Sequence, residues 1–220
     1  MSEDYKQFPI ELIPTSADLI SLPSGKTVLV PKATPRFKRW EGEDVPTFGG
    51  KAILDIGGEP LYAELAIVRL LQGRGWNAVW ANSYRRTYLD KIPGLSDPLP
   101  KDYLLDTPPH QRFGDAITTF GGIWDVVAWA GDDCIFAEGK RSKKDAINEN
   151  QEAWLEARLA DGATPQDFLL VEWEIDDGTI NLFELSKNGT ALVVETGRGG
   201  DRIATAIFKH PHGIVFADIG

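Results

Sequence analysis

The chain has 220 residues, a formal net charge of −10 and an isoelectric point of about 4.8. A hydrophobic content of 42% with seven tryptophans is ample for a packed core and argues against an intrinsically disordered chain. No apolar run approaches the ~20 residues needed to cross a bilayer, and the single cysteine, Cys134, excludes an intrachain disulfide, so we expect a cytoplasmic protein with no membrane contact.

The first 58 residues are rich in proline and glycine and contain short strand-like runs at 27–30 and 52–54. We interpret residues 1–58 as an N-terminal arm or small subdomain packed on a core that begins at residue 59. A basic run, 36–39, lies within this segment and could face an anionic partner.

The first clear helix is predicted to open at Glu59-Pro60, because proline is favoured at the first helical position. Its apolar stripe has helical spacing, and Gly73 and Gly75 are expected to end it. Glu64 lies at the edge of that stripe and can lean toward a sheet, although an exposed helical glutamate is the commoner outcome. A strand is predicted over residues 76–80.

Residues 82–115 contain five prolines and form a long connection, which in a compact domain is usually functional or a small subdomain. Arg85 and Arg86 follow a tyrosine there and are candidates for contact with bases and phosphates. An ordinary surface loop explains them equally well.

Two apolar runs then flank Gly131-Asp132, which is a two-residue hairpin signal. With the turn there, Asp125 lies directly opposite Glu138, and Lys140 shares that face because side chains alternate along a strand. Opposed like charges destabilise a sheet, so two carboxylates at this place require a cation. A divalent metal or a buried ion pair with Lys140 would supply it.

A helix is predicted over residues 147–161, and a buried strand follows over 168–173. Gln151 faces inward on that helix, where an amide needs a polar partner. Two interpretations remain open for Gln151. It can hold a group of the site, or it can complete a capping box with Asn148.

Residues 175–220 read as a β-rich C-terminal extension, with strand-like runs at 179–184, 191–195 and 214–216. The acidic balance argues against general polyanion binding, so contact with nucleic acid would depend on a local patch. The densest one, Arg141, Lys143 and Lys144, follows Lys140 directly.

The order of these pieces resembles the PD-(D/E)xK nuclease superfamily, and the wording around Asp125 and Glu138-Gly139-Lys140 resembles its VRR-Nuc (virus-type replication-repair nuclease) group. The resemblance covers about residues 59–174, with 82–115 as an insertion. Trp124 stands where the family usually has proline, which is a departure in backbone geometry more than in chemistry.

The resemblance implies an α/β fold, with a restriction-endonuclease-like mixed sheet flanked by helices and β-rich additions at both ends. It implies Asp125, Glu138, the Gly139 carbonyl and Glu64 as ligands of Mg²⁺ or Mn²⁺, with Lys140 and Gln151 completing the catalytic set.

The expected activity is metal-dependent hydrolysis of nucleic acid. DNA is favoured and RNA remains open, with Arg141, Lys143, Lys144, Arg85 and Arg86 binding the substrate. The alternative is a catalytically silent nuclease-fold subunit of a repair, phage or defence complex. Either reading is compatible with a protein partner or a homodimer.

Overall fold

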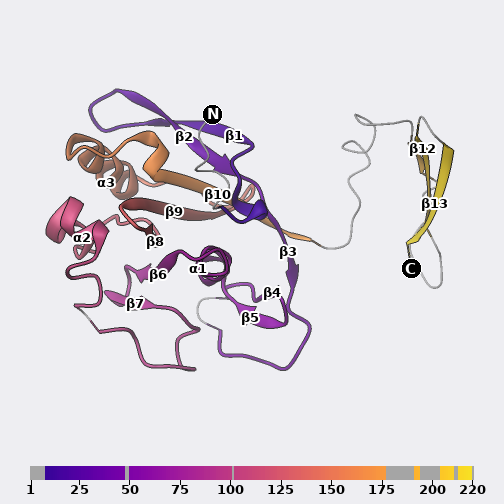
Figure 1. The fold of residues 1–220 in the computed structure, drawn as a ribbon, viewed down its shortest axis with the longest axis horizontal. Helices are drawn as coiled ribbons and strands as arrows, with labels where there is room; N and C mark the ends of the chain where they lie inside the picture. Colours follow the sequence, from indigo (N-terminus) through magenta and orange to yellow (C-terminus); the bar gives the residue numbers. More distant parts are fainter. Residues whose placement is uncertain are drawn as a thin grey trace. The chain divides into compact units, whose positions relative to one another are not determined.

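The computed structural model describes residues 8–47, 50–100 and 102–176 in full, and the backbone of three further strands between residues 191 and 219 (Figure 1). The chain divides into two compact units, residues 1–177 and 178–220, which we describe separately. Among the described residues, none of the helices combines the length and the apolar character needed to cross a membrane.

The first unit is built on one mixed sheet whose main order is β5-β4-β3-β10-β9-β8-β6-β7, with the hairpin β1-β2 joined to β10. The central strands are β10 (Phe168–Asp176), β9 (Asp133–Arg141), β8 (Val126–Ala130) and β6 (Asn77–Asn82). The outer strands are β1 (Ser16–Ser21), β2 (Thr27–Ala33), β3 (Arg36–Arg39), β4 (Leu54–Ile56), β5 (Glu59–Leu61) and β7 (Thr87–Leu89). β9 and β10 are parallel, whereas β8 is antiparallel to both β9 and β6. A mixed α/β architecture is therefore confirmed.

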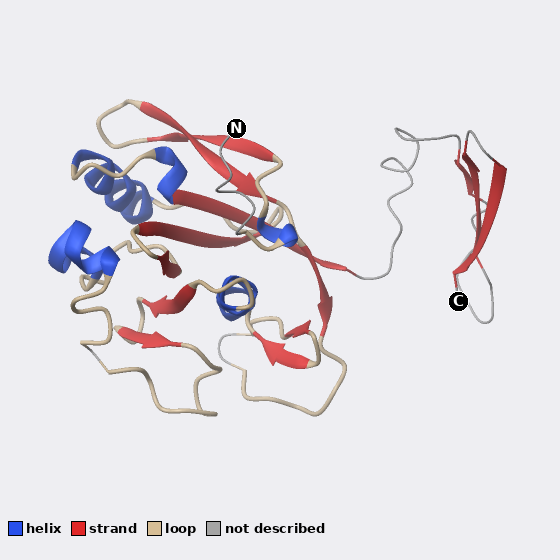
Figure 2. Ribbon diagram, in the orientation of Figure 1, coloured by secondary structure: helices blue, strands red, loops and turns tan. Residues whose placement is uncertain are grey.

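Helices cover both faces of this sheet (Figure 2). Helix α1 (Ala63–Gln72) buries its apolar stripe against one face. The other face carries α2 (Pro108–Phe113) and α3 (Glu149–Ala160), with the short 3-10 turns η3 (Gly114–Ile117) and η4 (Pro165–Asp167) beside them. A third 3-10 turn, η2 (Ile10–Leu12), precedes β1.

The face under α3 is held by packed aromatic rings. The centroid of Phe136 lies 4.9 Å from that of Trp154 and 5.6 Å from that of Phe168, and Trp124 packs edge-on against Phe168 at 5.1 Å. Buried aromatic pairs of this kind stabilise beyond the area they bury. They fix α3 against the strands that carry the acidic residues.

The hairpin register predicted from Gly131-Asp132 is confirmed. Ala130 pairs with Asp133 and Val126 pairs with Ala137, so the next position back places Asp125 opposite Glu138. Gly131 has φ +58°, the left-handed conformation that such a turn requires.

The predicted start of the first helix was wrong. Glu59 and Pro60 lie in strand β5, which pairs with β4 across Gly57 and Gly58, and α1 begins at Ala63. Both glycines have positive φ, as a two-residue hairpin turn requires. Proline is tolerated in β5 because this strand is at the edge of the sheet.

Strands from the N-terminal segment are built into the same sheet. β2 and β3 both run parallel to β10, at positions 32–33 and 36–38. The predicted strands at 27–30 and 76–80 correspond to β2 and β6, whereas the run at 52–54 overlaps β4. The described part of residues 82–115 contains β7 and α2, together with the last residue of β6 and the start of η3.

In the second unit, β11 (Ala191–Val193), β12 (Ala204–His210) and β13 (Gly213–Ile219) form an antiparallel three-stranded sheet. Strands predicted near 191–195 and 214–216 are confirmed as β11 and β13. The strand expected over 179–184 lies outside the described residues.

Candidate functional site

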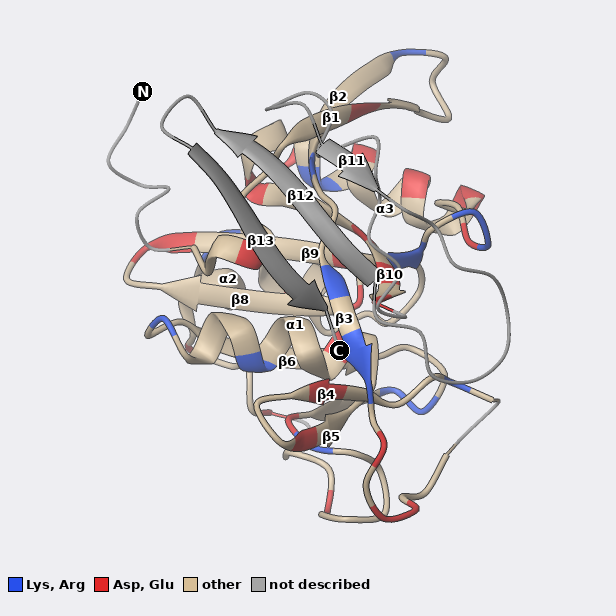
Figure 3. Ribbon diagram, turned by 90° about the vertical axis from the view of Figure 1, so that its right-hand side faces the viewer, with Lys and Arg blue, Asp and Glu red and all other residues tan. Residues whose placement is uncertain are grey.

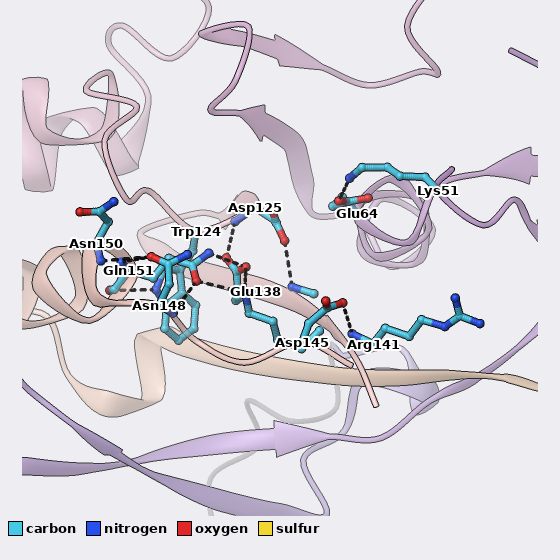
Figure 4. A network of polar contacts seen from close by, with 12 residues as sticks. Lys51, Glu64, Trp124, Asp125, Glu138, Arg141, Asp145, Asn148, Asn150 and Gln151 are labelled. Carbon is cyan, nitrogen blue, oxygen red and sulfur yellow. Dashed lines mark hydrogen bonds and ion pairs between the residues drawn. The ribbon is translucent and has the colours of Figure 1, made fainter. Parts of the chain in front are cut away.

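Asp125 and Glu138 are joined by two reciprocal hydrogen bonds, each between one side chain and the other strand's backbone (Figure 4). The Asp125 N–H donates to Glu138 Oε2 at 3.0 Å, and the Gly139 N–H donates to Asp125 Oδ2 at 3.1 Å. The N–H and C=O of one strand residue point to the same side, so the Gly139 carbonyl also faces Asp125. The Asp125, Glu138 and Gly139 triplet is thus brought together as predicted.

Glu138, Lys140 and Gln151 form a second, tightly connected group under α3. Lys140 Nζ lies 3.0 Å from Glu138 Oε1 and donates to Gln151 Oε1 at 3.0 Å. Gln151 Nε2 donates to Glu138 Oε1 at 2.6 Å. The side chain of Glu138 is only 2% exposed, so the lysine and the amide together compensate a buried carboxylate.

Both interpretations of Gln151 hold at once. Asn148 Oδ1 accepts from the backbone N–H of Gln151, and Gln151 Oε1 accepts from the backbone N–H of Asn148, which is a complete capping box. The same Gln151 amide reaches Glu138 and Lys140. The first turn of α3 therefore fixes the amide that orients Glu138.

Trp124 and Gly122 place the strand beside that turn. Trp124 is fully buried, and its indole N–H donates to the Gln151 carbonyl at 3.4 Å. Gly122 has φ +79°, and a Cβ at this position would lie 2.1 Å from the Asn150 carbonyl oxygen. The indole of Trp124 thus anchors the segment before β8, and Gly122 lets the two backbones approach.

Glu64 projects from the first turn of α1 into an open pocket of about 490 Å³ that Asp125 also lines. Lys51 lines the same pocket and donates to Glu64 Oε1 (Figure 4). Sequence reasoning missed Lys51, because it lies in an irregular segment with no periodic pattern. The pocket also contains Trp80 and Tyr84.

Burial raises the pKa of Asp125 well above its usual range, and the charges of Glu138 and Glu64 raise it further, against the opposing charge of Lys51. Burial also raises the pKa of Glu138, and Lys140 opposes that rise by its charge and hydrogen bond. For Lys51, burial acts to lower the pKa, but Glu64, with smaller contributions from Asp125 and Tyr62, more than offsets burial, and the pKa is raised. Perturbed groups of this kind, gathered at a pocket, are typical of functional sites.

Lys140 lines a different pocket, of about 330 Å³, together with Asp145 and residues of β1. Arg141 is the last residue of β9, and Lys143 and Lys144 follow in the next turn. None of the three lines the pocket of Asp125. The Arg141 guanidinium lies 5.6 Å from the Trp173 ring centroid.

The remaining basic groups differ in their surroundings. Arg85 lines the pocket of Asp125 and, with Arg86, belongs to the turn between β6 and β7. In β3, whose basic residues are blue in Figure 3, Arg36 pairs with Glu174 and Asp176 of β10. Of the five predicted substrate-binding residues, all of them within the described ranges, Arg85 lines the pocket of Asp125 and the other four do not.

The predicted metal ligands supply hard oxygen donors of the kind that Mg²⁺ and Mn²⁺ prefer. In the described ranges, no ion pair reaches the Asp125 carboxylate, so a bound cation would serve as the partner of its negative charge. Across those same residues, however, no three or more His, Cys, Asp or Glu side chains are gathered closely enough to hold a metal. Lys51 occupies Glu64 Oε1 and Lys140 occupies Glu138 Oε1, so a metal would compete with Lys51 for Glu64 and would share Glu138 with Lys140.

No family model, curated protein or solved structure matches this chain.

Proposed function

We propose that the chain is a metal-dependent phosphodiesterase that cleaves nucleic acid, with DNA as the favoured substrate. The observation that supports this most is the pair Asp125 and Glu138, each hydrogen-bonded to the other's strand and each disfavoured by burial as an anion. Such a pair is costly to bury, and a divalent cation would offset the cost. The resemblance to PD-(D/E)xK nucleases is in agreement with this assignment.

The reaction is hydrolysis of a phosphodiester bond. Water adds to phosphorus, one P–O bond breaks, and the products are a phosphate monoester and a hydroxyl. A bound Mg²⁺ or Mn²⁺ would lower the pKa of the attacking water and stabilise charge on the leaving oxygen. Asp125, Glu138 and Glu64 would hold it through carboxylates, with the Gly139 carbonyl as a further donor.

The chain's own groups orient these ligands. Lys140 and Gln151 hold Glu138 in place through Oε1, and Trp124 keeps the first turn of α3 beside them. Ligating carboxylates that are themselves hydrogen-bonded bind metal more tightly, and loss of such outer partners typically costs about 10–100-fold. We therefore assign Gln151 to the support of Glu138.

The test is a cleavage assay on labelled single-stranded, duplex and branched DNA and on single-stranded RNA, in Mg²⁺, Mn²⁺ or EDTA. Asp125→Asn and Glu138→Gln remove one charge each with little change of shape, and we expect each to lower cleavage at least about 100-fold, since direct ligands matter more than outer partners. Lys26→Met, in the exposed turn between β1 and β2, is the matched control. The proposal would be refuted if the wild type still cuts in EDTA. It would also be refuted if both acid variants cut as well as the wild type.

One observation favours a second candidate, a nuclease-fold subunit without activity. Two of the three acids are already neutralised within the protein, Glu64 by Lys51 and Glu138 by Lys140, and the net charge of −10 disfavours general binding of nucleic acid. This candidate predicts no turnover with any metal and no change in thermal stability on adding Mn²⁺.

A further inference from the structure

Two lysines accompany the acidic residues, and they lie in different pockets. Lys51 lines the pocket that Asp125 and Glu64 share, whereas Lys140 lines the pocket under β1 and α3. The side chain of Lys51 is 40% exposed and that of Lys140 is 12% exposed. A substrate entering beside Asp125 therefore meets Lys51.

The partners of Lys140 commit it to the protein. Its ammonium lies 3.0 Å from Glu138 Oε1 and 3.0 Å from Gln151 Oε1. If it turned toward a substrate, Glu138 would remain as a buried carboxylate without a cation, which is strongly destabilising. Lys140 is thus suited to hold Glu138 and poorly suited to leave it.

Lys51 is placed to meet an incoming anion. Its ammonium has three donors and gives one to Glu64 Oε1. It lies 5.0 Å from the ring centroid of Trp80 and 5.8 Å from that of Tyr62. Aromatic faces attract an ammonium within about 6 Å, so these two rings, which also line the pocket, hold the charge there while its remaining donors stay available.

We propose that Lys51 is the cation that contacts the substrate phosphate in the Asp125 pocket, and that Lys140 is a positioning residue for Glu138. The proposal rests on the nuclease function above and identifies a phosphate position within that site. An ammonium beside the reacting phosphate stabilises the negative charge that develops on its oxygens as water adds. It also explains why Glu64 has a lysine partner. When Lys51 moves to contact the phosphate, the same movement releases Glu64.

The first test is binding, which needs no turnover. Fluorescence anisotropy of a labelled single-stranded oligonucleotide is measured in EDTA and in Ca²⁺ across a salt series. We expect Lys51→Met to raise Kd about tenfold, because a charge-assisted hydrogen bond is lost. The slope of log K against log[salt] should fall by about 0.7, because one fewer phosphate of a single strand is neutralised. Lys51→Arg should retain most binding, and the control Lys26→Met should bind within about twofold of wild type. Lys140→Met is compared at a temperature where its unfolding curve shows it folded, and it should keep the wild-type salt slope.

The second test is a kinetic comparison with Mn²⁺ as the variable. Lys51→Met should lower kcat at saturating Mn²⁺ and at every pH. Lys140→Met should instead raise the Mn²⁺ concentration for half-activity, since Glu138 loses the ammonium that holds its Oε1 in place. Thermal unfolding of each variant checks that the fold is intact.

The outcomes separate this inference from the nuclease proposal. Weaker binding in Lys51→Met with no cleavage by wild type in any metal would leave the phosphate position standing and refute the nuclease. Metal-dependent cleavage by wild type that is lost in Asp125→Asn but unaffected in Lys51→Met would refute the role of Lys51. Loss of oligonucleotide binding in Lys140→Met alone would overturn the division between the two lysines.

Discussion

At Asp125, burial opposes ionisation, so the residue should cost the fold stability at neutral pH. Its folded-state pKa is raised above the ordinary value of 3.8, so the folded state binds the proton more tightly than the unfolded chain. Stability is then greatest below the unfolded pKa and falls as pH rises toward the folded one. We predict that Asp125→Asn unfolds at a higher temperature than wild type at pH 7, by a few degrees, since about 1 kcal/mol corresponds to about 2–4 °C in a domain of this size.

Differential scanning calorimetry between pH 3.5 and pH 8 checks this. The difference in Tm should shrink toward pH 3.5, where the aspartate is protonated in the folded state and more than half protonated in the unfolded chain. Adding Mn²⁺ should raise the Tm of wild type and leave that of the variant unchanged, because only wild type retains the ligand. A variant less stable than wild type at pH 7 would mean that the Asp125 carboxylate is stabilising.

At the same scale, the sequence was sufficient for residues on regular elements. Asp125, Glu138 and Gln151 could be placed because a strand alternates its faces and a helix repeats every 3.6 residues. Lys51 could not, because no local pattern links it to Glu64, 13 residues away. The sequence also could not predict that Lys140 and Asp125 line different pockets. Asp125 precedes the first residue of β8, so strand alternation does not fix the direction of its side chain, which turns toward Gly139.

At the scale of elements, the β8–β9 hairpin and α3 form one assembly, and Gly122 controls how closely they approach. A methyl group there would lie 2.1 Å from the Asn150 carbonyl oxygen, and φ +79° is strained for any residue with a Cβ. We predict that Gly122→Ala lowers the free energy of unfolding by roughly 1–3 kcal/mol and lowers cleavage further by moving Gln151 away from Glu138.

Gly121→Ala is the matched control, because nothing lies within 4 Å of its added Cβ. Urea denaturation and the cleavage assay should find Gly121→Ala close to wild type. Equal stability of the two alanine variants would show that the loop before Asp125 adapts and does not fix the site.

The elements also show why one boundary was predictable and another was not. Gly131-Asp132 separates two long apolar runs, so the turn position and the whole register follow from it. Gly57-Gly58 is an equally good turn, but its strands β4 and β5 have three residues each and are stabilised by the sheet edge. Proline at position 60 then imitated a helix start. Tertiary pairing decided between two local signals of similar strength.

For the whole molecule, a net charge of −10 means that attraction to nucleic acid depends on a few cations in one place. The pocket of Asp125 has three nearby, Lys51 in its wall and Arg85 and Arg86 in the β6–β7 turn. Three phosphate contacts on a single strand give a slope of log K against log[salt] of about −2. We predict a slope of about −2 for the wild-type chain, which is smaller in magnitude than the slope of a basic nucleic-acid-binding domain.

Two double variants with the same change in net charge test which part of the surface the nucleic-acid strand follows. Arg85→Gln with Arg86→Gln should reduce the magnitude of the slope by about 1.4, because the β6–β7 turn, in which Arg85 lines the Asp125 pocket, loses both of its cations. Lys143→Gln with Lys144→Gln removes two exposed charges at the end of β9, away from that pocket, and should leave the slope near −2. Anisotropy at several salt concentrations measures both slopes.

Because the overall charge falls equally in the two variants, a general electrostatic effect would reduce the magnitude of both slopes together. A decrease confined to the lysine pair would place the strand along the pocket of Lys140 and would make Lys140, not Lys51, the cation beside the phosphate.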